Sequence, residues 1–375
     1  MRTISLQIVL VLGCLVTGVP GGPAAGAEAK VAILYCTDLF HPYVDPDDHF
    51  DLATLFALEE FDVRGIVLDL GAKQKQKTGR PAVEQMMWIT GRRVPCAIGL
   101  GRPLASRMDK ALDQPEEFQG GVRLILDTLR DWPGKVAIFS TGSCRDVAAA
   151  FNRQPDLFRR KVQVVYVNAG NGPGGVQTEY NVGLDPQAYA RMFESGLPLY
   201  WCPCFGAEGY QTLLTIDQAR VIGGCAPAVQ NFFVYCLTRS QADPIRFLRS
   251  GSHPLPGGQR RMWCTAALLD AAGRKIYQRG ADDFVALRPG DARQAGLAEK
   301  EVRVFEFLPM RGRATEEMKE GKMQLDVELN PAEPAGFIFR ATDHRYEMIM
   351  GSCLKNLLGS LGREDNRGKA NLRPN

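Results

Sequence analysis

Five aspartates lie close together near the start of the chain, at Asp38, Asp45, Asp47, Asp48 and Asp51. Capping of a helix N-terminus accounts for one or two of them, because carboxylates there interact favourably with the helix dipole. It does not account for the four within the span 45–51, since like charges at this spacing repel one another. A bound hard cation relieves that repulsion, and Ca²⁺ binds about six to eight oxygen ligands of this kind. The pattern favours a Ca²⁺ site over a solvated helix cap.

The segments that must position these aspartates alternate between apolar strand patterns and helical patterns. Strands are predicted at 31–36, 62–70, 94–101, 135–142, 161–170 and 197–205. Helices are predicted between them at 47–61, 80–91, 120–132, 144–154 and 185–196. This alternation is typical of parallel strands joined by crossovers, so we expect an α/β fold with a doubly wound, mostly parallel sheet flanked by helices. Ligands of such sheets bind beyond the carboxyl ends of the strands, where Asp38 stands.

The alternation ends near residue 205, and an elaborated C-terminal α+β part is expected after it. Helices are predicted at 229–239, 262–273 and 343–361, and strands at 282–287, 301–308 and 336–342. We expect one domain over residues 28–362 rather than two domains, followed by a disordered tail at 363–375.

Residues 1–27 have the layout of a secretory signal peptide. Arg2 precedes an apolar run at 4–19, and small residues at 25–27 form a cleavage site. The run is shorter than the roughly 20 residues that a membrane span needs. We therefore expect export to the periplasm or the extracellular space and no membrane span. Lipoprotein anchoring at Cys14 is the less favoured alternative.

Charge and cysteine content argue against a nucleic-acid-binding protein and against a fully disulfide-bonded one. The net charge of +3 is spread along the chain without a basic block, which argues against a nucleic-acid partner. The chain has ten cysteines, and the nine beyond the signal cannot all pair internally because their number is odd. Reduced, buried thiols are the favoured interpretation. The pair Cys202 and Cys204 is spaced too tightly for the usual zinc motif.

Several segments resemble, in order, the inosine-uridine preferring nucleoside hydrolases. The matching stretches are TD at 37–38, DPDD at 45–48, FDVRGI at 61–66, VPCAIGLGRPL at 94–104 and KVAIFSTGSCRDVAAAF at 135–151. The most specific match is TEYNVGLDP at 178–186, where Glu179, Asn181, Asp185 and Pro186 hold the family's spacing. The resemblance covers residues 31–205 well and the C-terminal third weakly.

The resemblance implies hydrolysis of the N-glycosidic bond of ribonucleosides by a Ca²⁺-bound water, with an aspartate as general base. It makes Asp38 the base and a metal ligand, Asp48 a bidentate ligand and the Thr141 carbonyl a further ligand. Asp47 would bind a ribose hydroxyl. Glu179 and Asn181, with Asn171 as a helper, would complete the ribose site. The expected partner is a small nucleoside or ribosyl compound, and homo-oligomer formation is left open.

The chain also departs from the family pattern. Cys36 replaces the family's first aspartate, and residues 39–46 form an insertion in the metal loop. The His-Asp pair that opens a late helix, whose Asp binds Ca²⁺ and whose His serves the leaving base, has no match. Met262 and Trp263, or Arg260 and Arg261, stand there instead.

Asp45, or Asp51 if the first helix starts late, is expected to replace the missing ligand. A subset of exported bacterial nucleoside-hydrolase-like proteins with a DPDD opening resembles this sequence better than typical members do. Two alternatives to nucleoside hydrolysis therefore remain open. One is a catalytically degenerate protein that binds nucleosides or ribose on the same fold, and the other is a hydrolase of another glycoside.

Overall fold

The computed structural model describes residues 30–177, 179–314 and 325–363. The expected signal peptide at 1–27, with Cys14, lies outside these residues, as does nearly all of the expected tail at 363–375. No helix in the described part of the chain is long and apolar enough to cross a bilayer.

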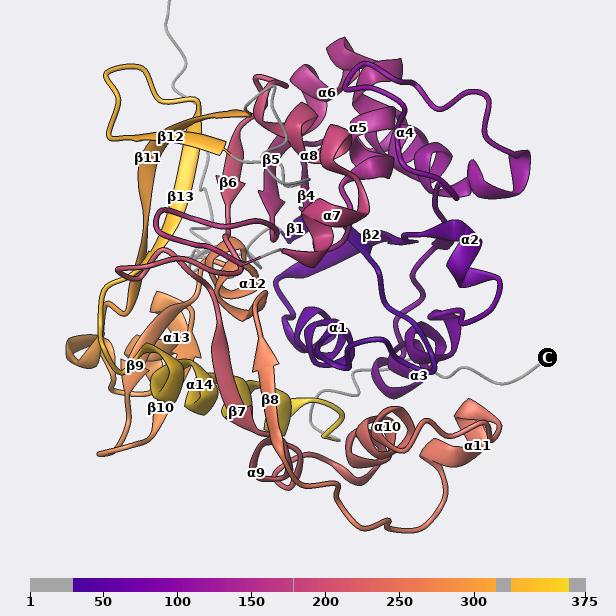
Figure 1. Cartoon of the computed structure of the whole chain (residues 1–375). Helices are drawn as coiled ribbons and strands as arrows, with labels where there is room; N and C mark the ends of the chain where they lie inside the picture. Colours follow the sequence, from indigo (N-terminus) through magenta and orange to yellow (C-terminus); the bar gives the residue numbers. More distant parts are fainter. Residues whose placement is uncertain (1–29, 178, 315–324, 364–375) are drawn as a thin grey trace, which may run out of the picture.

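A nine-stranded sheet runs through the centre of the molecule (Figure 1). Its strand order is β12-β11-β13-β6-β5-β4-β1-β2-β3. The strands from β13 to β3 are parallel neighbours, whereas β11 pairs antiparallel with both β13 and β12. The bounds are β1 Val31–Thr37, β2 Phe61–Leu68, β3 Cys96–Ile98, β4 Val136–Ser140, β5 Val162–Val167, β6 Leu199–Trp201, β11 Phe305–Ala314, β12 Leu325–Leu329 and β13 Gly336–Ala341. The expected doubly wound, mostly parallel sheet is confirmed.

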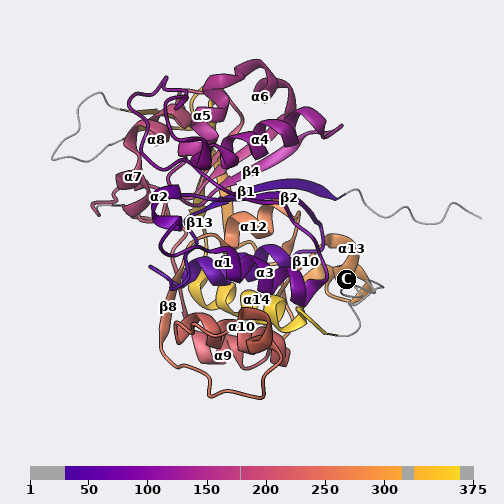
Figure 2. The ribbon, with the colours of Figure 1, turned by 90° about the vertical axis from the view of Figure 1, so that its right-hand side faces the viewer.

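Two hydrophobic cores cover the two faces of the sheet, because side chains of a strand alternate between faces. In β1, Ile33 and Tyr35 belong to one core, and Leu34 and Cys36 to the other. The second core lies beneath the helices that Figure 2 shows above the sheet. These helices are α4 Gly120–Asp131, α5 Arg145–Arg153, α6 Pro155–Lys161 and α8 Pro186–Phe193.

The first core lies on the opposite face, beneath a thicker layer of helices (Figure 2). This layer contains α1 Asp47–Ala57, α3 Arg80–Thr90, α10 Pro227–Leu237, α12 Thr265–Ala271 and α14 Tyr346–Ser360. Helix α1 is buried at every position from His49 to Ala57, because it contacts α3, α10, α12 and α14. Its first turn carries Asp47 and Asp48. The acidic segment is thus fixed to a helix of the core.

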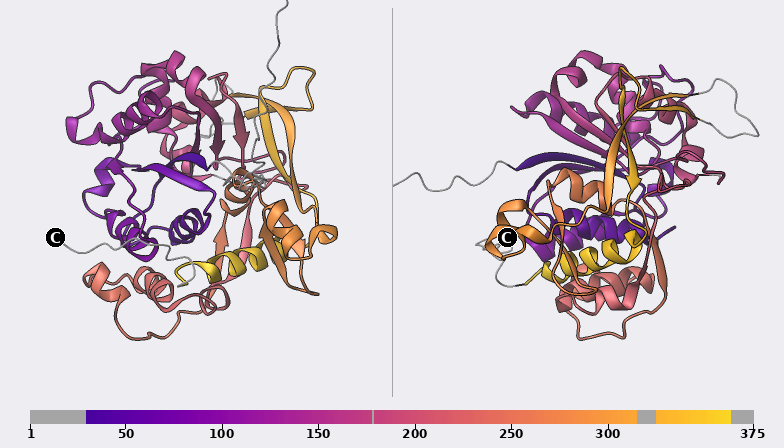
Figure 3. Two further views of the ribbon diagram at one scale, coloured as in Figure 1. Left: turned by 180° about the vertical axis from the view of Figure 1, so that it is seen from behind. Right: turned by 90° about the vertical axis from the view of Figure 1, so that its left-hand side faces the viewer.

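The C-terminal third extends the same fold, since β11, β12 and β13 join the central sheet. Two small antiparallel ribbons lie outside it: β7 Leu214–Asp217 with β8 Gln259–Met262, and β9 Lys275–Gln278 with β10 Phe284–Leu287. Figure 3 shows these ribbons and α14 on the side of the sheet that carries α1. The remaining short helices are α2 Gly71–Gln74, η1 Glu116–Phe118, α7 Tyr180–Leu184, α9 Gln218–Ile222, α11 Pro244–Leu248, α13 Pro289–Gln294 and η2 Ala298–Lys300.

The described cysteines are all free thiols, and every one except Cys96 is buried. This agrees with the reduced, buried role expected from their odd number.

Candidate active site

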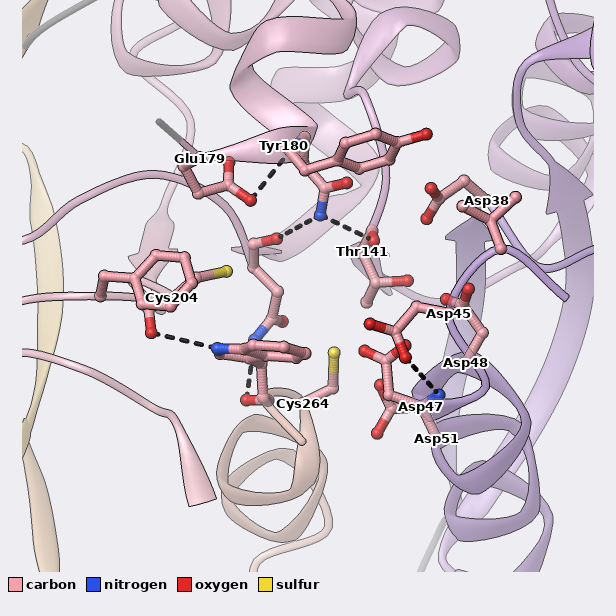
Figure 4. A pocket seen from close by; sticks show the side chains of 15 residues that line it. Asp38, Asp45, Asp47, Asp48, Asp51, Thr141, Glu179, Tyr180, Cys204 and Cys264 are labelled. Atoms are coloured by element: carbon pink, nitrogen blue, oxygen red, sulfur yellow. Dashed lines mark hydrogen bonds between the residues drawn. The ribbon is translucent and has the colours of Figure 1, made fainter. Parts of the chain in front are cut away.

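A cavity of about 330 Å³ opens at the carboxyl ends of the parallel strands (Figure 4). This is the place where open α/β sheets bind their ligands. Segments far apart in the sequence line it: the β1–α1 connection and the first turns of α1, the ends of β4 and β5, the start of α7, the chain after β6, and the chain before α12. The lining residues are Asp38, Val44, Asp45, Asp47, Asp48, Asp51, Thr141, Asn168, Glu179, Tyr180, Asn181, Cys204, Phe205, Trp263 and Cys264.

All five aspartates singled out from the sequence line this one cavity. Asp38 directly follows β1 and is buried. Because α1 starts at Asp47, Asp51 comes one turn later on the same helix face and is almost completely buried. Asp45 lies before the helix, is exposed, and contacts Arg260 with 3.4 Å between Nη1 and Oδ1. The Thr37 hydroxyl donates to Asp48 over 3.2 Å.

Burial and the charge of neighbouring carboxylates raise the pKa of four of these groups, Asp38, Asp47, Asp48 and Asp51. The pKa of Asp38 is raised to about 7, mainly by burial and then by the charge of Asp69. Burial also raises the pKa of Asp51 to about 7, although a hydrogen bond from the Cys264 thiol lowers it. The pKa values of Asp47 and Asp48 are raised well above their ordinary range by burial first and by neighbouring aspartates second. Without a counter-charge, the cluster therefore retains protons near neutral pH.

The donors at this end of the cavity match the chemistry of a hard divalent cation. They are carboxylate oxygens together with the Thr141 carbonyl, and such oxygens are the preferred ligands of Ca²⁺. Oδ1 of Asp51 is buried and has no hydrogen-bond partner within the described residues. Across those same ranges, however, no three His, Cys, Asp or Glu side chains are already arranged as a metal site. The donor types fit a cation, whereas the side chains do not yet converge on one point.

The wall opposite the aspartates is built around α7. Glu179 caps this helix, because its carboxylate accepts from the backbone N–H groups of Asn181 and Val182 at 3.0 and 2.8 Å. The same carboxylate accepts from Gly170 N–H over 2.9 Å. Asn181 donates through Nδ2 to the carbonyl oxygens of Thr141 and Asn168, at 3.1 and 3.3 Å. Asn181 thus connects the ends of β4 and β5 to α7.

The structure brings Asn168, rather than the expected Asn171, to the cavity. Asn171 is absent from the lining and donates through Nδ2 to the Gln177 carbonyl. Asn168 is buried, and its Oδ1 has no partner within the described part of the chain. Its position directly after β5 equals that of Asp38 directly after β1. That equivalence is the signal in the sequence from which Asn168 could have been found.

The late helix, predicted at 262–273, starts three residues later than expected. Residues 259–262 form β8, because they pair with β7. Met262 is fully buried in the core, Arg260 and Arg261 lie on the strand, and α12 begins only at Thr265. Trp263 and Cys264 are the residues that reach the cavity before this helix. Cys264, placed beside Asp51, was not singled out from the sequence.

Trp263, which precedes α12, and Phe205, which follows β6, form an aromatic wall of the cavity. Their ring centroids are 6.0 Å apart with an interplanar angle of 75°. The indole N–H of Trp263 donates to the Cys204 carbonyl over 3.1 Å, which fixes the ring. Near Asp38, Tyr180 is half exposed and its hydroxyl accepts from Lys73 Nζ over 3.3 Å.

A buried charged group braces the site from behind. Asp69, which follows β2, accepts from the backbone N–H groups of Leu70 and Ser143, each over 2.6 Å. Nε of Arg145 lies 3.8 Å from Asp69 and 3.6 Å from Asp185. Asp185 in turn caps α8. Asp69 is not among the cavity-lining residues, so its place is behind the ligand site.

Comparison with known proteins gives a consistent result. A sequence model described as inosine-uridine preferring nucleoside hydrolase matches residues 43–245, more than half of the chain. The pyrimidine-specific ribonucleoside hydrolase RihA of Citrobacter koseri is 28% identical over 171 residues, which are 41% of this chain and 55% of the relative. RihA of Escherichia coli O1:K1 / APEC is 27% identical over the same lengths. The chain thus spans about half the length of the curated relatives that it matches.

Solved structures show the same fold at low sequence identity. A purine-preferring ribonucleoside hydrolase from Gardnerella vaginalis superimposes with a TM-score of 0.56 and 17% identity, covering 88% of this chain and 99% of the other. The plant nucleoside hydrolase PpNRh1 gives a TM-score of 0.53 and 14% identity over 88% and 99%. These similarities establish the architecture.

Proposed function

Since this chain belongs to the inosine-uridine preferring nucleoside hydrolase family, we propose that it hydrolyses the N-glycosidic bond of ribonucleosides. One observation carries the proposal: five aspartates and the Asn168–Asn181 pair line opposite sides of a single cavity at the strand ends. Carboxylates stabilise an oxocarbenium-like ribosyl centre, and amides bind sugar hydroxyls. The proposed substrate is a small ribosyl compound.

Asp38 is the general base in this proposal. It directly follows β1, is buried and lines the cavity, so its carboxylate is placed to act on a water bound there. Asp38 accepts the proton of the attacking water at a carboxylate oxygen and then releases it to solvent. Asp47 and Asn181 hold ribose hydroxyl groups, and Asn168 orients the sugar with its unpartnered Oδ1.

Asp38, Asp48 and the Thr141 carbonyl would hold a Ca²⁺ ion. When bound, the ion would supply a positive charge that orients the vicinal hydroxyls and lowers the pKa of water. For the further ligand we favour Asp51 over Asp45. Oδ1 of Asp51 is buried and unpartnered within the described residues, while Asp45 is exposed and contacts Arg260.

Two observations favour a second candidate, a protein that binds ribosyl compounds without turnover. Cys264 precedes α12, where the family pattern has a metal-binding aspartate. The carboxylate of Glu179 already accepts three backbone hydrogen bonds, which reduces its capacity for a ribose hydroxyl. Hydrolysis of another glycoside is a third candidate, favoured by the aromatic wall of Trp263 and Phe205. Export and oligomeric state stay predictions.

Ribose release from a panel of ribonucleosides, measured with Ca²⁺ and with a chelator, tests the proposal. We expect release that depends on Ca²⁺. Calorimetry should show that Asp48→Asn weakens Ca²⁺ binding by about 100-fold or more, since a ligand is lost. Asp62→Asn is the matched control, because Asp62 lies on β2 and pairs with Arg64. A folded protein that releases no ribose from any nucleoside, yet binds them, would favour the binding role.

A further inference from the structure

The aromatic wall offers the cavity ring surface and no spare hydrogen-bond donor. The only polar atom of the Trp263 side chain, Nε1, already donates to the Cys204 carbonyl over 3.1 Å. Phe205 has no polar atom and packs edge-on against Trp263. An aromatic face attracts cations through its quadrupole, and Trp does so more strongly than Tyr or Phe. This wall is therefore suited to a flat, electron-poor group.

Negative charge surrounds the same cavity. Its lining contains Asp38, Asp45, Asp47, Asp48, Asp51 and Glu179, whereas the described lining residues include no Lys, Arg or His. Two basic groups lie just outside the lining: Arg260 contacts Asp45, and Lys73 donates to the Tyr180 hydroxyl. One divalent cation would offset part of the negative charge that these carboxylates carry when ionised. Clefts lined by one sign of charge concentrate ligands of the opposite sign.

On these grounds, and resting on the proposed function, we infer that the preferred substrates are ribonucleosides whose glycosidic nitrogen is positively charged. N-ribosyl pyridinium compounds are the simplest members of this class. Their planar cationic ring would stack on Trp263 while the carboxylates attract its charge. Trp263 and Phe205 are then the residues that determine the specificity for the leaving group.

The chemistry of the leaving group points the same way. When the bond from C1′ to nitrogen breaks, both bonding electrons go to the nitrogen. A neutral base departs as an anion and must gain a proton, whereas a pyridinium departs as a neutral ring. Water supplies the hydroxyl that bonds to C1′, and its proton passes to Asp38. The described lining of the cavity includes no histidine, and the indole N–H of Trp263 already donates to the Cys204 carbonyl. A cationic substrate needs no donor there.

Binding of a matched pair of probes tests the recognition step without turnover. The 1-methylnicotinamide cation and neutral nicotinamide differ in charge and share the same ring. Calorimetry on the full chain with Ca²⁺ should show the cation binding at least about tenfold more tightly, with an affinity that falls as salt is added. Trp263→Leu should remove most of this preference, and Trp263→Phe should retain part of it. Equal affinity for the two probes would overturn the inference.

Turnover of four substrates separates this inference from the proposed function. They are the nicotinamide ribonucleoside, uridine, inosine and 4-nitrophenyl riboside. The last is an uncharged substrate whose leaving group departs as the stable 4-nitrophenolate anion, without a proton donor. We expect kcat/KM for the cationic nucleoside to exceed that for uridine and inosine by about 100-fold or more.

Comparable rates for the cationic and neutral nucleosides would refute the preference and leave the hydrolase standing. A protein that cleaves none of the four, 4-nitrophenyl riboside included, contradicts the proposed function itself. Tyr180→Phe checks for a hidden proton donor, since the Tyr180 hydroxyl contacts Lys73. Selective loss of uridine and inosine cleavage in that variant would also overturn the inference.

Discussion

At the scale of a single residue, the surroundings of Asp51 could not be read from the sequence. Asp51 lies four residues after Asp47, so both face the cavity from α1. From the sequence, the loop residue Asp45 was expected to replace the missing metal ligand, and Asp51 only if the first helix started late. The structure starts the helix at Asp47 and still brings Asp51 to the cavity, one turn later on the same face. There the Cys264 thiol, from a segment far along the chain, hydrogen-bonds to it. That contact depends on tertiary packing.

The substitution Asp51→Asn tests this assignment. It keeps the size of the side chain and removes the charge whose Oδ1 is buried without a partner in the described ranges. We expect Ca²⁺ affinity measured by calorimetry to fall by about tenfold or more. Asp45 is an exposed carboxylate that contacts Arg260, so Asp45→Asn should lower the Ca²⁺ affinity by less. If Asp45→Asn lowers the Ca²⁺ affinity more than Asp51→Asn does, the ligand role belongs to the loop.

At the scale of an element, the N-terminal turn of α5 joins the segments that follow β2 and β3 to the start of α8. Asp146 accepts from Leu100 N–H at 3.1 and 3.2 Å, and Arg145 reaches Asp69 and Asp185. Gly99 permits the close approach, because a Cβ there would lie 2.3 Å from a carboxylate oxygen of Asp146. In the sequence this glycine appears only as part of the stretch 94–104 that resembles the nucleoside hydrolases. The need for a glycine there comes from a contact with another element, which the sequence does not reveal.

Asp146 should make the stability of the protein depend on pH. Burial first, and the charge of Asp69 second, raise its pKa to about 8, compared with about 3.9 for an unfolded aspartate. Between these values the folded protein holds more protons than the unfolded chain. The contribution of Asp146 to stability is thus complete below about pH 4 and is lost as the pH rises through about 8.

Thermal unfolding from pH 5 to 9 measures this effect. Asp146→Asn keeps an acceptor for Leu100 N–H and should make the melting temperature less dependent on pH. Asp127→Asn is the control, because Asp127 is exposed and pairs with Arg130 on α4. An unchanged pH profile in the Asp146 variant would show that another group titrates in this range.

Elements of the first two hundred residues could be predicted because their local patterns agree with the fold. The predicted strand at 31–36 and helix at 80–91 match β1 and α3 closely. The predictions fail where pairing decides the structure. Residues 262–264 carry a helical pattern, but β8 pairs with β7 as far as Met262, so Trp263 and Cys264 are left between a strand and a helix.

At the scale of the whole molecule, the C-terminal third supports the site from a distance. Helix α14 contacts α1, α12 and the ribbon strands β7 and β10 (Figure 3). Leu354 and Leu358 on α14 are fully buried in the same core as Phe50 and Leu55 of α1. The sequence predicted α14 itself, but not that it packs behind the aspartates, since that contact joins opposite ends of the chain.

The substitution Leu354→Ala tests this support. Removal of a fully buried leucine side chain should lower the free energy of unfolding by about 2–5 kcal/mol. Lys355→Ala on the neighbouring, partly exposed position should change it by about 0.5 kcal/mol or less. Urea denaturation measures both. Similar losses in the two variants would mean that α14 is not packed as described.

The two halves of the cavity differ in how freely they can change during divergence. The aspartates of α1 belong to a helix that is buried from His49 to Ala57, so a replacement there must satisfy the core and the ligand together. Trp263 stands between two elements and Phe205 follows β6, and both are partly exposed, so the core restricts a new side chain there less. Related chains should therefore retain their sugar chemistry while exchanging the residues equivalent to 205 and 263. Differences in the preferred leaving group among such relatives should follow those two positions.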